Sequence, residues 1–180
     1  EYPRAAVLLG DTYLAGKVIP QDREKAMTYY LSVADRYPDA NFALARMFVG
    51  QPQALTYFNK GFALAKNQPD PTGGVAYEIA REFEKGEIVA KDITKADEWY
   101  QRAAAANNAA ALYDFAQMRR DNGYQPQSDI AALVEKAAAL NYPPALAEMG
   151  VAYDMGWNMP QDSQKAAGYF RNAMDRDPYQ

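Results

Sequence analysis

Two stretches of the sequence, 140 residues apart, decide the fold. Residues 10–30 read GDTYLAGKVIPQDREKAMTYY, and residues 150–170 read GVAYDMGWNMPQDSQKAAGYF. Around them, fourteen of the 35 positions from residue 2 to residue 36 are identical to positions 142–176, with no gap. Residues 80–100, AREFEKGEIVAKDITKADEWY, repeat the same pattern at an offset of 70. The period is therefore 35 residues, and the chain of 180 residues has room for five units.

The pattern predicts a single repeat domain over residues 1–180 with units at 2–36, 37–71, 72–107, 108–141 and 142–177. The second and fourth units are degraded copies. The second has a short middle loop after Gly50, and the fourth has Arg119 in place of a central tyrosine. Pro178 follows Pro38 by 140 residues, where a further unit would begin. We therefore expect the chain to be a piece of a longer array.

The first half of each unit has the spacing of an amphipathic helix. Ala5, Leu9 and Tyr13 lie four residues apart and predict one buried stripe. Gly10 costs about 1 kcal/mol of helix propensity relative to alanine. We therefore expect a neighbouring helix to approach closely at Gly10. Gly16 is expected to end this helix, because a C′ residue commonly takes the left-handed conformation.

The second half of each unit predicts another helix. Asp22 stands where an N-cap is needed, and Asp92 and Asp162 repeat it. In the fourth unit we expect Ser128 or Asp129 to be the cap. In the second unit, Pro52 suits the first helical turn. The predicted buried stripe of the first unit's second helix consists of Ala26, Tyr30 and Ala34.

These helix pairs predict an all-α fold, a right-handed α-solenoid of about five helix–turn–helix repeats of 35 residues. One such pair cannot bury its apolar face alone, and stacked neighbours bury a continuous core. The pattern Ala5-x3-Leu9-Gly10-x2-Tyr13-x2-Gly16 resembles the Sel-one-like repeat, a relative of the tetratricopeptide repeat. The third unit carries the same resemblance at Asp92-x2-Lys95-Ala96-x2-Trp99-Tyr100. The resemblance implies a protein-interaction scaffold and no enzyme.

A narrower resemblance covers about fifty residues at the start of the chain. Pro20-Gln21-Asp22 and Pro38-x-Ala40-Asn41 are similar to repeats in the scaffold lipoproteins of alginate secretion in pseudomonads. This resemblance implies a bacterial envelope assembly for exopolysaccharide secretion. It also implies a periplasmic or outer-membrane-associated location, with a cytoplasmic one left open. The lipid-anchored cysteine of those proteins has no counterpart here.

The composition removes many functions. The formal net charge is −4, and nucleic-acid binding depends on a basic surface. The sequence has no cysteine and no histidine, so thiolate chemistry and the commonest general base are absent. Carboxylate pairs such as Glu82 with Glu84, or Glu84 with Glu87, could hydrolyse glycosides without histidine. They lie in a charge-rich segment that is typical of a solvated surface. We therefore predict no catalytic residue, no cofactor and no metal.

A partner surface is predicted on the side of the first helices opposite the Ala5 stripe. Positions 7, 11 and 14, counted as in the first unit, give aromatic residues with arginines nearby in the middle units. Aromatic residues and arginine are enriched in binding hot spots. Trp157, in the last helix–helix loop, is expected to be exposed, whereas Trp99 is expected in the core. The predicted partner-binding residues of a concave face are Phe42, Arg46, Tyr77, Arg81, Tyr113, Arg120 and Trp157.

Other interpretations of the same residues stay open. The aromatic side chains could pack between adjacent first helices, and the arginines could pair with Glu78, Glu82 or Glu84. Aromatic rows also stack on sugars, so a direct polysaccharide-binding module is an alternative. A third possibility is a signalling adaptor that is unrelated to polysaccharide export. The sequence predicts protein partners, no nucleic acid and no membrane-spanning segment.

Overall fold

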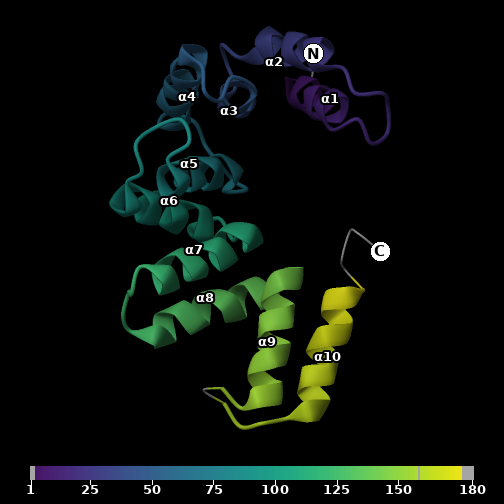
Figure 1. Ribbon diagram of the computed structural model, residues 1–180, viewed down its shortest axis with the longest axis vertical. Coiled ribbons are helices and arrows are strands. Elements are labelled where there is room, and N and C mark those ends of the chain that lie inside the picture. The colour runs from purple at the N-terminus through teal and green to yellow at the C-terminus, as the bar shows by residue number, and fades with distance from the viewer. Residues whose placement is uncertain (1–2, 158, 176–180) are drawn as a thin grey trace. The chain divides into compact units, whose positions relative to one another are not determined.

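The computed structural model describes residues 3–157 and 159–175. Within these residues the chain forms ten α-helices and no strand (Figure 1), so the predicted all-α helical repeat fold is confirmed. Pro178, which suggested a further unit, lies outside the described residues. The helices are α1 (Pro3–Ala15), α2 (Arg23–Val33), α3 (Pro38–Met47), α4 (Pro52–Ala65), α5 (Gly74–Lys85), α6 (Ile93–Ala105), α7 (Ala109–Asp121), α8 (Gln127–Ala139), α9 (Pro143–Met155) and α10 (Ser163–Met174).

The chain divides into two compact units. The first comprises residues 1–70 and 78–96, and the second comprises residues 71–77 and 97–180. In the first unit α1 pairs with α2, α3 pairs with α4, and α2 packs on α3. In the second, α7 pairs with α8, α9 pairs with α10, and α8 packs on α9. The predictions of one continuous domain and of a right-handed solenoid stay predictions.

The predicted N-caps of three second helices are confirmed. Asp22 accepts a hydrogen bond from the Lys25 backbone N–H at 2.9 Å. Asp92 and Asp162 accept equivalent bonds, at 3.0 and 2.9 Å, from the residues three positions on. Each bond satisfies a backbone donor that has no partner within the helix. The loops before these helices therefore have the same geometry in repeats one, three and five.

The predicted cap of α8 is wrong. Pro126 is the N-cap residue, and no side chain caps the helix. Ser128 and Asp129 instead lie inside the first turn, because α8 begins at Gln127. There the Asp129 carboxylate still faces the positive end of the helix dipole, where a negative charge is favourable. Pro52, by contrast, begins α4 as predicted.

Gly10 allows the close helix approach that the sequence predicted. A Cβ atom at Gly10 would lie 2.5 Å from Cε1 of Tyr30, a residue of the paired helix α2. The same arrangement recurs in the last repeat, where a Cβ at Gly150 would lie 2.6 Å from Cε1 of Phe170. The cost in helix propensity is therefore the consequence of placing an aromatic ring directly against the backbone.

The predicted stripe of α2 is buried, but the predicted stripe of α1 is not. Ala26, Tyr30 and Ala34 form a core cluster with Ala40, Ala43, Leu44 and Met47 of α3. Ala5 and Leu9 were predicted to be buried, yet both are exposed. The physical reason is that no helix of the described residues covers this side of α1. Trp99 is buried as predicted, at 7% exposure. Among the described residues, no helix has the length and apolar character that crossing a bilayer requires.

Candidate functional site

A small open pocket lies in the first unit, between α3, α4 and α5 (Figure 1). The buried side chains of Phe42, Ala45 and Phe58 form its apolar lining. Charged side chains around it are Arg46, Glu78, Arg81, Glu82, Lys85 and Glu87. Its volume is about 70 Å³, far below the several hundred Å³ of typical ligand and cofactor sites. The pocket therefore has room for the tip of one side chain.

The ionic groups of this pocket are arranged by neighbouring helices. Arg46 of α3 donates a hydrogen bond to Glu78 of α5 at 2.6 Å. Glu82 accepts hydrogen bonds from the backbone N–H groups of Ile88 and Val89. It thereby holds the loop that follows α5 against its own helix. The Arg46–Glu78 pair is about half exposed on the arginine side, so it orients the guanidinium more than it stabilises the fold.

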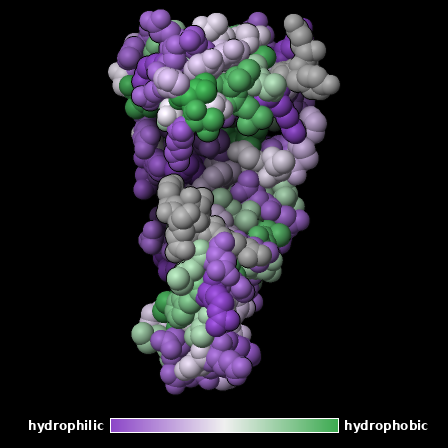
Figure 2. All heavy atoms as spheres, turned by 90° about the vertical axis from the view of Figure 1, so that its right-hand side faces the viewer, coloured by the Kyte–Doolittle hydropathy of each residue, from purple (hydrophilic) through white to green (hydrophobic). Residues whose placement is uncertain are grey.

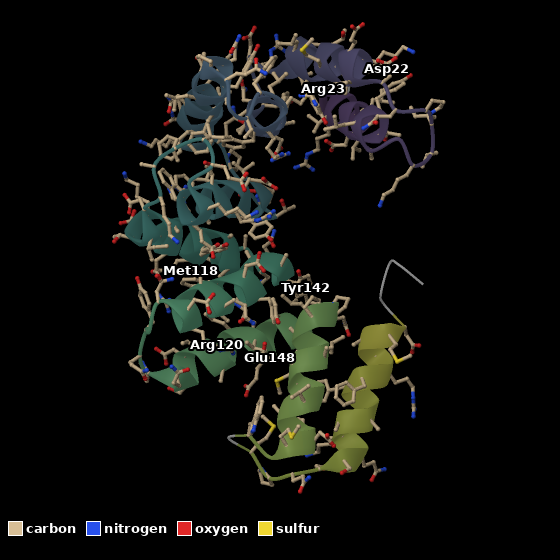
Figure 3. All side chains as sticks on the ribbon, viewed as in Figure 1. Asp22, Arg23, Met118, Arg120, Tyr142 and Glu148 are labelled. Carbon is tan, nitrogen blue, oxygen red and sulfur yellow. The ribbon has the colours of Figure 1, made fainter. Side chains whose placement is uncertain are left out.

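A second polar cluster lies in the second unit, where α7 meets α9. Arg120 donates a hydrogen bond to Glu148 at 2.6 Å and another to Gln117 at 2.9 Å (Figure 3). Gln117 in turn donates to Glu148 at 3.0 Å. The Tyr113 ring lies 5.6 Å from the Tyr142 ring. Burial, and next to it the Glu148 carboxylate, raises the pKa of the Tyr113 hydroxyl.

Tyr77 is held in the same second unit. Its hydroxyl donates a hydrogen bond to Asp114 of α7 at 2.6 Å, and its ring lies 6.3 Å from that of Tyr100. Together with Tyr113, this residue therefore packs between helices of adjacent repeats. The structure thus shows for Tyr77, Tyr113 and Arg46 the packing and pairing that the sequence offered as the other interpretation.

The seven predicted partner-binding residues do not share one environment. Phe42 is 3% exposed, so its prediction as a surface contact is wrong. The Phe42 ring packs 5.6 Å from Phe58 and against Gly61, which leaves only its edge on the pocket wall. Arg46 and Arg81 both line that pocket. Trp157 is exposed as expected, at 61%, in the loop after α9. That any of these residues binds a partner stays a prediction.

The sequence analysis missed the acidic residues that receive these hydrogen bonds. They occupy position 8, one residue after the aromatic position 7, in repeats three, four and five. The signal was present, because Leu8 has acidic equivalents at offsets of 70, 106 and 140. The polar contacts between successive first helices are Arg46 to Glu78, Tyr77 to Asp114 and Arg120 to Glu148. The arginines and tyrosines of positions 7, 11 and 14 therefore join neighbouring repeats.

The fold and these repeat-to-repeat contacts define an all-α helical repeat protein. The profile of the Sel1 repeat family matches residues 3–36, 75–108 and 143–177, more than half of the chain. The chain belongs to the Sel1 repeat family. Proteins built from this repeat are generally non-catalytic protein-interaction scaffolds. The matched segments are repeats one, three and five, those whose N-caps are aspartates.

Solved structures of other repeat proteins share this fold. A Sel1 repeat protein from Oxalobacter formigenes is 25% identical, with a TM-score of 0.76 over 98% of this chain and 74% of that one. A putative Sel1 repeat protein from Klebsiella pneumoniae is 18% identical, with a TM-score of 0.56 over 97% and 87%. The immunity protein Pa5087 from Pseudomonas aeruginosa is 15% identical, with a TM-score of 0.69 over 97% and 68%. No curated protein matches the chain.

Proposed function

We propose that this protein is a non-catalytic scaffold that binds a protein partner at the pocket formed by Arg46, Arg81 and Lys85 of the first unit. The observation that carries the proposal is a small apolar pocket with three cationic side chains around it. A partner side chain with an apolar stem and a carboxylate end would place its stem on Phe58 and its charge near the arginines. Arginine is suited to this role because its guanidinium binds carboxylates in a bidentate manner.

The scaffold would act by presentation. Proteins held at fixed positions on one repeat surface meet at a high effective concentration, so their encounter becomes effectively intramolecular. No bond of the partner needs to change. The carboxylate pair Glu82 with Glu84, weighed in the sequence as a glycosidase site, is a poor candidate for catalysis. The carboxylate of Glu82 is already bound to the backbone N–H groups of Ile88 and Val89.

We further propose that the scaffold works in a bacterial envelope assembly, in the periplasm or at the outer membrane. Its pathway would be exopolysaccharide secretion of the alginate type. This proposal rests on the resemblance of Pro20-Gln21-Asp22 and Pro38-x-Ala40-Asn41 to the scaffold lipoproteins of that pathway. Direct polysaccharide binding has weaker support, because the Phe42 ring is buried and Tyr77 and Tyr113 are engaged between helices. A regulatory adaptor outside polysaccharide export remains the other candidate.

The experiment is affinity capture from envelope extract with three versions of the chain. These are the parent, the charge reversal Arg81→Glu, and a control reversal Arg36→Glu at an exposed arginine outside the pocket. We expect the parent and Arg36→Glu to capture the same protein, and Arg81→Glu to lose it. The loss expected is about tenfold or more, as for a hot-spot residue. Thermal melting of all three separates loss of binding from unfolding.

Two outcomes would overturn this assignment. Equal capture by Arg81→Glu and the parent would place the partner elsewhere on the chain. Saturable binding of purified alginate by the parent, with no protein captured, would replace the protein scaffold with a sugar-binding module. Capture of a cytoplasmic signalling protein in place of an envelope protein would overturn the location and keep the scaffold.

A further inference from the structure

The outer face of α1 has no partner helix in the first unit, although the equivalent face is buried in later repeats. Leu8 is 65% exposed and Leu9 is 42% exposed, and Ala5 is exposed beside them. The equivalents of Ala5 and Leu9 in α3, Ala40 and Leu44, are both 0% exposed. Figure 2 shows hydrophobic side chains gathered in the part of the surface where Figure 1 places α1. The face of α1 is therefore built to be covered.

The chain itself shows what covers such a face. In the first unit, Ala26, Tyr30 and Ala34 of α2 pack on Ala40 and Leu44 of α3. In the second unit, α8 packs on α9 in the same order. The cover is in both cases the second helix of the preceding repeat. The surface that fits α1 is accordingly the outer face of a helix of this second type.

One such outer face is exposed in the second unit. On α10, the residues 140 positions after Ala26, Tyr30 and Ala34 are Ala166, Phe170 and Met174. Met174 is 58% exposed, whereas its equivalent Ala34 is 3% exposed beneath α3. The Phe170 ring is half-buried, whereas that of Tyr30 is fully buried. The outer face of α10 thus carries the apolar stripe of a covering helix, without a helix to cover.

The polar pattern of the first helices makes the same match. Where positions 7, 11 and 14 of one repeat carry arginine or tyrosine, position 8 of the next repeat carries an acid. Where they carry Val7 and Leu14, position 8 of the next repeat is Ala43, and these three residues pack together in the core of the first unit.

The two ends of the chain follow the apolar version of this rule. The last repeat carries Ala147 and Val151 at positions 7 and 11, and the first repeat carries Leu8 at position 8. An α9–α10 end placed on an α1 face would therefore set apolar residues against apolar residues. No unpaired charge of these positions would be buried, which would otherwise oppose association.

We propose that copies of this chain associate head to tail, with the α9–α10 end of one copy packed on the α1 face of the next. The contact repeats the α2–α3 interface between chains, so its two sides are different surfaces. Such heterologous contacts extend into open arrays unless the rotation closes a ring. This inference does not rest on the partner pocket, since the pocket involves neither α1 nor α10.

The test is sedimentation velocity of the chain from about 1 µM to about 1 mM, the range that a weak interface populates. We expect the weight-average sedimentation coefficient to rise with concentration. Leu9→Arg at one end and Met174→Arg at the other should each reduce this rise to that of a monomer. Leu55→Arg is the matched control, because Leu55 of α4 is a comparably exposed leucine, at 46%, on neither face.

Mixing the two variants gives the decisive arm. The Leu9→Arg copy keeps an intact α10 end, and the Met174→Arg copy keeps an intact α1 face. Together they should form a one-to-one dimer that cannot extend. A parent chain that stays monomeric over the whole range would overturn the proposal. So would association that survives both single variants, or a mixture of them that stays monomeric.

Discussion

A methyl group added at Gly10 should destabilise the chain, even though alanine is the better helix former. The alanine side chain gains about 1 kcal/mol of helix propensity. Its Cβ would lie 2.5 Å from the ring of Tyr30, so the ring must retreat by about 1 Å to reach ordinary van der Waals contact. Overpacking of this kind costs about 1–3 kcal/mol. The Tyr30 ring is fully buried, so it has little room to retreat.

A hydrogen bond adds to this cost. The Tyr30 hydroxyl donates to the Asp11 carboxylate at 2.7 Å, and a displaced ring would lengthen or break that bond. Such a bond contributes about 1 kcal/mol. The net effect expected for Gly10→Ala is therefore a loss of about 2 kcal/mol in the free energy of unfolding, after the gain in helix propensity is subtracted.

Two other glycines serve as comparisons. At Gly150 a Cβ would lie 2.6 Å from the ring of Phe170, but this ring is half-buried and has no hydroxyl to hold it. Gly150→Ala should therefore cost less, about 1 kcal/mol or below. At Gly168, inside α10, no atom lies within 4 Å of an added Cβ. Gly168→Ala should stabilise the chain by about 1 kcal/mol, since only the propensity changes.

The assay is urea unfolding followed by far-ultraviolet circular dichroism, with the slope held common to all variants. The expected order of stability is Gly168→Ala, parent, Gly150→Ala, Gly10→Ala. A Gly10→Ala chain as stable as the Gly168→Ala chain would refute the reasoning. It would show that α1 and α2 separate at little cost, and that the tyrosine ring does not set their spacing.

Three further predictions follow from single contacts. Arg119 forms a bidentate ion pair with the largely buried Asp97, at 2.8 and 3.1 Å, so Asp97→Ala should cost about 2 kcal/mol in urea unfolding, and the double variant Asp97→Leu with Arg119→Met should recover most of it. The N–H of Lys25 lowers the pKa of Asp22, so the advantage of the parent over Asp22→Asn should be present at pH 6 and vanish at pH 3; a constant difference would contradict it. Asn141 has φ of +62°, so Asn141→Val should lower the melting temperature, whereas Asn141→Gly should leave it nearly unchanged.

The residues that joined the repeats were only half visible in the sequence. The arginines and tyrosines of positions 7, 11 and 14 were singled out because of their residue types. Their acceptors at position 8 lie 28 to 37 residues further along the chain. No local pattern links two such positions. The link is made when successive first helices pack side by side, so a row predicted for a partner turned out to hold the repeats together.

Burial at the chain's first repeat was also beyond local reasoning. Ala5 and Leu9 have the same spacing and chemistry as Ala40 and Leu44, which predicts the same burial. Whether a residue is buried depends on the helix that packs against it, and the described part of the chain supplies that helix for α3 but not for α1. The cap of α8 failed for a local reason, since Pro126 took the extended conformation one step earlier than the side-chain caps required.

What the sequence determined by itself was the repeat and its local geometry. The period of 35 residues, the aspartate caps and the glycine at the close helix contact all depend on residues within one helix pair. Hydrogen bonds of a cap and the space beside a glycine are short-range effects, so identical residues give identical results in each unit. The tertiary structure decided which charges pair, which aromatic rings are buried and which apolar faces stay open. These depend on the neighbouring repeat, because desolvation and charge pairing are properties of an interface and not of a residue.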